Sequence, residues 1–171
     1  NMSLFLVTLP RQDGTGQEQK PEKELIGIME QLYASWSNIH TRGWNKFLHG
    51  EPYLALEMAV HHVGEQIHFY IAVPRNYEQV FEKQVHGVFP SAEVQKVNDY
   101  NVFNPTGAYA GGSLKLKGDP VLPLVTYLKL QSDPLGGIAT ALSKLDREGQ
   151  GAAIQILIRP SHRDDIRKLA Q

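Results

Sequence analysis

The order in which strand-like and helix-like hydrophobic patterns alternate along residues 3–99 constrains the fold most. Residues 4–9 are largely apolar on both alternating faces, and Pro10 ends the run, which predicts a strand with a central place in its sheet. A polar, glycine-containing loop follows, and a helix is predicted to begin near Lys23. The apolar stripe of this helix comprises Leu25, Ile28, Met29, Leu32 and Trp36.

Two alternating apolar runs at residues 53–61 and 66–73, separated by a turn at Gly64, predict a β-hairpin. With Gly64 and Glu65 at the tip, we expect the pairs Val60 with Phe69, Met58 with Ile71, and Leu56 with Val73. This register makes Phe69 a core residue and places Tyr70 on the opposite face.

A second helix and a short strand complete the first unit. Asn76 and Gln79 predict an N-cap and its partner three residues later, and the helical stripe then runs from Tyr77 to Val88 before Pro90. A strand at 93–97, with Val94 inward, follows. Residues 3–99 therefore predict the order strand, helix, strand, strand, helix, strand, which is the split βαβ or ferredoxin-like arrangement.

The rest of the chain repeats this pattern incompletely. After a glycine-rich linker at 100–112, strand-forming residues at 113–130 precede a helix at 134–145, capped by Ser132 or Asp133, a strand at 152–159 and a helix from 162. We predict an α+β fold of tandem ferredoxin-like halves, with an antiparallel sheet packed by helices and the second half, 113–171, truncated. A single continuous sheet shared by both regions is the alternative.

Because the chain stops before a final strand, we expect it to be a piece of a longer protein with a strand edge to cover. The apolar strand 152–159, or 113–130, should either pair with another copy of the chain or be shielded by helix 162–171.

Composition excludes several classes of protein. The formal net charge is −1, which is unlike a basic nucleic-acid binder, and the absence of cysteine excludes a disulfide framework and fits a cytoplasmic protein. No apolar run reaches the ~18–20 residues of a membrane helix.

Motifs for catalysis and for cofactors are lacking. The glycine-rich stretch 107–114 has no lysine where a phosphate-binding loop needs one, and no GxSxG turn or cysteine nucleophile occurs. His61 and His68 face each other in the predicted hairpin and are the candidate zinc ligands, without an HExxH motif to support them. We expect no cofactor and no enzymatic activity in this chain.

One sheet face carries the residues most suited to an interaction. The candidate interaction residues are Glu57, His61, His68, Tyr70, Lys115, Lys117 and Lys129. A deep pocket on this face would favour a ligand, whereas a covered face would favour a scaffold. The RNA-binding signature of ferredoxin-like sheets is absent and Glu57 shares a face with Tyr70, although contact with DNA stays open.

Seven blocks together resemble a known family. They are LFLVTLP (4–10), KELIGIMEQLYASW (23–36), YLALEMAV (53–60), HFYIAVP (68–74), VFPSAEVQKVNDYNVFNP (88–105), SLKLKG (113–118) and the stretch 132–160. In order and spacing these blocks resemble the region that precedes the P-loop motor in conjugation or type IV secretion ATPases of Gram-positive and small-genome bacteria.

The resemblance implies a non-catalytic N-terminal accessory or assembly domain at the inner face of the membrane. Its implied partners are the downstream motor domain, secretion-channel proteins and other copies of the chain. The Walker motifs of the family have no matching positions here. The alternative function is a ligand- or nucleic-acid-sensing module on a ferredoxin-like scaffold.

Overall fold

The computed structural model describes residues 2–10, 22–36, 52–61, 66–115, 117–118, 129, 133–145 and 149–159. The elements in chain order are β1 (Met2–Thr8), α1 (Glu22–Trp36), β2 (Leu54–Val60), β3 (His68–Pro74), the 3-10 turn η1 (Arg75–Tyr77), α3 (Glu78–Val88), β4 (Glu93–Val97), α4 (Pro134–Leu142) and β5 (Ala152–Ile158). The expected strand at 113–130 is not seen among the few residues described there, and the expected helix from residue 162 lies outside the described residues.

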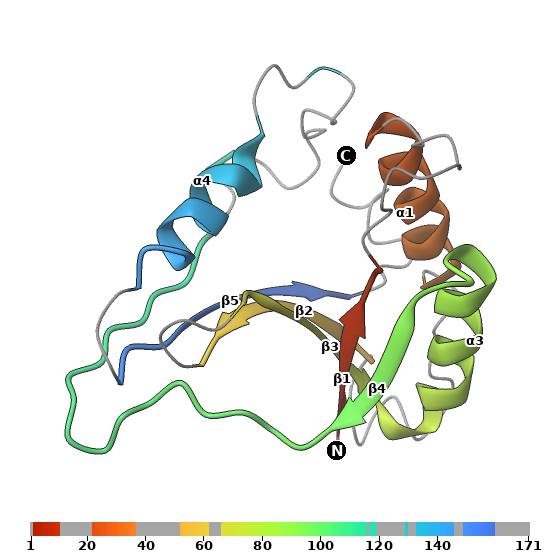
Figure 1. Cartoon of the computed structure of the whole chain (residues 1–171). Coiled ribbons are helices and arrows are strands. Elements are labelled where there is room, and N and C mark those ends of the chain that lie inside the picture. The colour runs from red at the N-terminus through yellow and green to blue at the C-terminus, as the bar shows by residue number, and fades with distance from the viewer. Residues whose placement is uncertain are drawn as a thin grey trace.

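The strands form one five-stranded antiparallel sheet in the order β4-β1-β3-β2-β5 (Figure 1). β1 lies between β4 and β3, which confirms its predicted central place. The first six predicted elements are all present, and their order is compatible with a ferredoxin-like unit.

β5 comes from beyond the glycine-rich linker and still joins the same sheet. It pairs with β2 along its whole length, from Val60 opposite Ala152 to Leu54 opposite Ile158. The described residues therefore show an α+β fold with a continuous sheet, and they do not confirm a tandem of separate halves.

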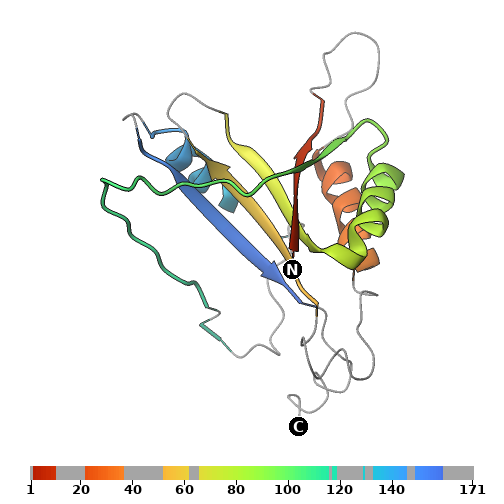
Figure 2. The same ribbon diagram turned by 90° about the horizontal axis from the view of Figure 1, so that it is seen from below.

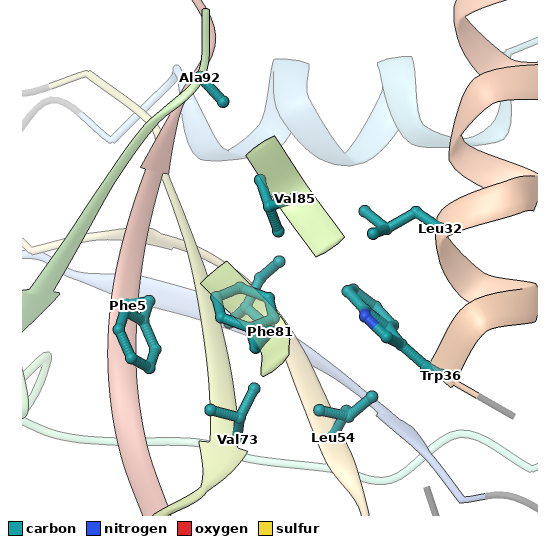
Figure 3. Packing of buried hydrophobic residues seen from close by; sticks show 9 residues of the cluster. Phe5, Leu32, Trp36, Leu54, Val73, Phe81, Val85 and Ala92 are labelled. Carbon is teal, nitrogen blue, oxygen red and sulfur yellow. The ribbon is translucent and has the colours of Figure 1, made fainter. Parts of the chain in front are cut away.

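The hydrophobic core lies between α1, α3 and one face of the sheet (Figure 3). Phe5 and Phe81 are almost fully buried, and their ring centroids are 5.1 Å apart. Leu32 and Trp36 of α1 are buried on the predicted stripe of that helix. Burial of each large apolar side chain stabilises the fold by roughly 1.5–3 kcal/mol, so this layer anchors the β4–β1 side of the sheet.

The predicted hairpin register is wrong by two residues. Met58 lies opposite Phe69 and Leu56 opposite Ile71. Because side chains alternate along a strand, a shift of two residues leaves every side chain on its predicted face, and the hydrophobic pattern alone cannot distinguish the two registers. The predicted tip at Gly64 lies outside the described residues.

Phe69 is not the core residue that the sequence suggested. Its side chain is on the same face as the core, but 52% of its surface is exposed. The core cluster reaches Ile71, two residues further along β3, and does not include Phe69. The physical reason is coverage, because α1 and α3 stand over the β4–β1 side of the sheet (Figure 1).

The predicted cap at Asn76 is also wrong. Asn76 lies inside η1, and α3 begins at Glu78 after Tyr77, which makes no side-chain capping bond. Pro74 has an extended conformation with φ −60°, and the 3-10 turn starts directly after it, so the chain turns before Asn76 can cap.

The capped start of α4 follows the prediction. The Asp133 carboxylate accepts a hydrogen bond of 2.9 Å from the Leu135 N–H, and Pro134 occupies the first helical position. The helix ends at Leu142, earlier than expected.

Candidate interaction site

The face of the sheet opposite the helices is crossed by residues 98–112, which we call the strap (Figure 2). The sequence suggested a flexible linker over nearly the same range. Several side chains on this face are buried although none of the described helices packs there, including Ala55, Ala59 and Tyr70 at 6% exposure or less. Within the strap, Tyr100 and Val102 are partly buried, whereas residues 103–112 are exposed.

Glu57, in the middle of β2, accepts hydrogen bonds from two other parts of this face. It is 9% exposed, and each of its carboxylate oxygens accepts one hydrogen bond. The Tyr100 hydroxyl donates to Oε2 at 2.7 Å, and Gln155 Nε2 donates to Oε1 at 2.6 Å. One carboxylate thereby joins β2, the edge strand β5 and the strap.

These bonds compensate the burial of a charged group. An unpaired buried carboxylate is costly, whereas a hydrogen bond to a charged group stabilises by about 1.5–3 kcal/mol. The pKa of Tyr100 is raised well above the ordinary value of 10, first because burial disfavours the phenolate and second because the phenol donates to Glu57. Tyr100 is therefore a neutral donor at physiological pH.

The ring of Tyr100 stacks on two other rings, those of Tyr70 on β3 and of His61, the residue that follows β2. Its centroid lies 4.7 Å from the rings of both His61 and Tyr70, with interplanar angles of 16° and 19°. The Tyr70 hydroxyl and His61 Nε2 are 2.9 Å apart. His68 stacks on His61 at 5.2 Å. We call the six residues Glu57, His61, His68, Tyr70, Tyr100 and Gln155 the Glu57 cluster.

Two glycines allow the strap to lie close to the start of β5. A Cβ on Gly151 would stand 3.0 Å from the Val102 carbonyl oxygen and 3.2 Å from that of His61. Gly149 has φ +82°, and a Cβ there would stand 2.7 Å from Asn104 Nδ2. The strap and β5 are thus in contact through backbone as well as through Glu57.

A groove of about 730 Å³ lies between the strap and the sheet. Glu57, Tyr100 and Gln155 line it, together with the basic residues Arg75 and Lys96. The groove is therefore lined by side chains of both signs of charge. Both oxygens of the Glu57 carboxylate already accept a hydrogen bond.

The structure brings together four of the seven predicted interaction residues, Glu57, His61, His68 and Tyr70. Lys115, Lys117 and Lys129 are exposed and take part in none of the contacts of the Glu57 cluster. The two candidate zinc ligands, His61 and His68, are stacked on one another. Within the described ranges, no group of three or more histidine, cysteine, aspartate or glutamate side chains is placed to hold a metal ion.

Tyr100 and Gln155 were missed by the sequence reasoning. The signal that pointed towards them was Glu57 itself, a single carboxylate within the apolar strand 54–60. A buried carboxylate requires donors. The sequence does not say which donors, because Tyr100 and Gln155 are 43 and 98 residues away.

The two edge strands of the sheet differ in chemistry. β4 carries the charged residues Glu93 and Lys96. Lys96 Nζ lies 2.8 Å from Glu78 Oε2, and Glu78 also accepts a hydrogen bond from the Ser3 hydroxyl. The pKa of Glu78 is lowered, mainly by the bond from Lys96 and next by that from Ser3. Charged side chains of this kind are a common protection of sheet edges.

β5, with the sequence AAIQILI, has no charged residue and no proline. Two of its large side chains are substantially exposed to solvent, Ile156 at 49% and Leu157 at 62%. Ile156 stands on the helix face, and so does the half-exposed Phe69. Among the described residues, β5 has β2 as its neighbour on one side and no strand on the other.

Comparison with known proteins gives a family. A family model described as a domain of unknown function, DUF8128, matches residues 17–171. The chain belongs to the DUF8128 family. The match covers the strap and all strands of the DUF8128 sheet except β1. No curated protein and no solved structure matches the chain.

In the part of the chain that the structure describes, no helix combines the length and the apolar character needed to cross a bilayer.

Proposed function

We propose that this DUF8128 chain is a non-catalytic assembly domain that binds another polypeptide by adding a strand at the outer edge of β5. The observation that carries the proposal is the contrast between the two edges of the sheet. β4 has the charges that protect an edge, whereas β5 has none and leaves Ile156 and Leu157 half or more exposed.

Strand addition uses the chemistry that β5 offers. The unpaired N–H and C=O groups of an edge strand supply main-chain hydrogen bonds, and alternate side chains supply specificity. On the helix face, Ile156 and Phe69 provide apolar surface beside the edge. On the other face, the bond from Gln155 to Glu57 holds the middle of β5 against β2.

The resemblance to the accessory region of conjugation or type IV secretion ATPases supports a narrower form of this proposal. In that form the domain serves a motor at the inner face of the membrane, and its partners are the downstream motor domain and channel proteins. β5 would then belong to a second ferredoxin-like half.

A ligand- or nucleic-acid-sensing role is supported less well. It would use the sheet face that carries Glu57 and Tyr70, but the strap lies over that face and Tyr100 already stacks on Tyr70. A nucleic acid would also meet the Glu57 carboxylate there, and its phosphates would be repelled.

A peptide-binding experiment tests the proposal. A fluorescent peptide with the sequence of residues 150–159 is titrated with the chain, and a scrambled peptide serves as its control. We expect saturable binding that Ile156→Asp weakens by at least about tenfold, or about 1.4 kcal/mol, because aspartate adds a charge and disfavours strand structure. The matched variant Gln95→Asp on β4 should bind as the unmodified chain does. Equal affinity of the two peptides, or equal loss in the two variants, would refute strand addition at β5.

A further inference from the structure

We infer that the strand which β5 accepts is β5 of a second copy of this chain, paired antiparallel about a two-fold axis at Gln155. This inference rests on the proposed function, since it names the partner of the same edge. A second copy presents an identical edge, so a two-fold contact is self-complementary if the strand matches its own reverse.

The small and large side chains of β5 are arranged so that two antiparallel copies of the strand complement each other about Gln155. In the paired register, Ala152 lies opposite Ile158 and Ala153 opposite Leu157 of the other copy. Small residues thus face large ones, and Ile154 faces Ile156 at the centre. Cross-strand pairs of this kind are the unit of sheet stability, and the alternation of small and large side chains fills space without overlap.

Other two-fold registers use the strand less well. An axis at Ile156 pairs only residues 154–158 with strand residues of the other copy, and it sets Pro160, which has no N–H, opposite Ala152. An axis at Ile154 places Leu157 opposite Gly151. Only the axis at Gln155 pairs all seven residues of β5.

The two faces of the sheet continue across this pairing. Side chains opposite one another lie on the same face, so the helix faces of both copies join. The half-exposed Ile156 of one copy then lies beside Ile154 of the other, with Phe69 one strand beyond β2 in each copy. On the strap face the two Gln155 side chains meet at the axis, each held by its own Glu57.

Charge does not oppose the association. β5 has no ionisable side chain, and the whole chain has a formal net charge of only −1, so two copies approach with little repulsion. At the other edge, two copies of β4 would set Glu93 against Glu93 with an axis at Glu93, and Lys96 against Lys96 with an axis at Lys96. β5 has no ionisable side chain, so no register of β5 brings like charges together.

Disulfide cross-linking tests the register, and the absence of native cysteine leaves no background. Directly opposed residues in an antiparallel pair have Cα atoms about 4.5–5.5 Å apart, within the range of a disulfide. Gln155→Cys should therefore cross-link two copies under mild oxidation. Ala153→Cys and Leu157→Cys alone should not, because each lies about 13 Å along the strand from its counterpart. The double variant with cysteine at both 153 and 157 should cross-link.

Sedimentation equilibrium of the unmodified chain tests the partner independently. We expect a monomer–dimer equilibrium, a dissociation constant at least tenfold higher for Ile156→Asp, and no change for Gln95→Asp. A chain that stays monomeric while it binds the β5 peptide would overturn this inference and leave strand addition standing. A monomeric chain that also ignores the peptide would overturn both. Cross-linking of Ala153→Cys alone, or a dimer unaffected by Ile156→Asp, would overturn the Gln155 axis.

Discussion

The hydroxyl of Tyr100 offers the most direct test of the role of the strap. Tyr100→Phe keeps the ring that stacks on His61 and Tyr70 and removes only the donor to Glu57. A hydrogen bond to a charged group stabilises by about 1.5–3 kcal/mol. Because Tyr100 is partly exposed and Glu57 keeps its bond from Gln155, we expect a loss of about 1–2 kcal/mol in the free energy of unfolding.

Urea denaturation at pH 7 measures this loss, with Tyr109→Phe, 84% exposed, as the matched control that should be neutral. Tyr100→Ala should lose about 1 kcal/mol more, since the ring stacking is also removed. If the two variants Tyr100→Phe and Tyr109→Phe change the free energy of unfolding equally, the hydrogen bond from Tyr100 to Glu57 does not stabilise the fold and the account of the strap is refuted.

The dependence of the free energy of unfolding on alkaline pH provides a second measurement. The folded state raises the pKa of Tyr100 above its ordinary value of 10. The phenol therefore contributes stability that is complete below pH 10 and is lost as the pH rises above that value. Tyr100→Phe should reduce the alkaline loss of stability. Identical alkaline curves for the two proteins would contradict this assignment.

Three further predictions concern stability. Glu78→Gln should weaken the loss of stability at acid pH. The pKa of Glu78 is lowered in the folded state, so its stabilising effect is present above the ordinary pKa of 4.5 and is lost as the pH falls through the lower folded value. Unchanged acid denaturation of the variant would contradict this. Gly151→Ala should cost about 1–3 kcal/mol by pushing the strap away, whereas Gly87→Ala, with open space on α3, should be neutral or stabilising; thermal unfolding distinguishes them. Phe81→Ala should cost about 3–5 kcal/mol in urea denaturation and the half-exposed Phe69→Ala only about 1, so equal losses would contradict the described core.

Elements with strong periodicity were predictable from the sequence. The stripe that includes Leu32 and Trp36 predicted α1 and its buried side, and the two-sided apolar run predicted the internal place of β1. These features depend on neighbours three or four residues apart, or on alternate residues. Local pattern is sufficient for them.

Features that depend on distant parts of the chain were not predictable. A hairpin register and its two-residue shift have the same hydrophobic pattern, so the pattern could not select the register. Phe69 was placed in the core because it shares the core face, although α1 and α3 do not reach it. Tyr100 was assigned to a linker because nothing near it in sequence indicates Glu57. The candidate face was found in part, through Glu57 and Tyr70, while the residues that complete it come from the strap and β5.

The most direct test of assembly at β5 is backbone NMR of the labelled chain during titration with the peptide of residues 150–159. Whether the peptide pairs with a free edge or replaces the β5 of a second copy, we predict that amide shifts concentrate in Ala152–Ile158 and that Glu93–Val97, on the opposite edge, stays unchanged. Shifts confined to the strap or to β4, with β5 unaffected, would contradict assembly through β5.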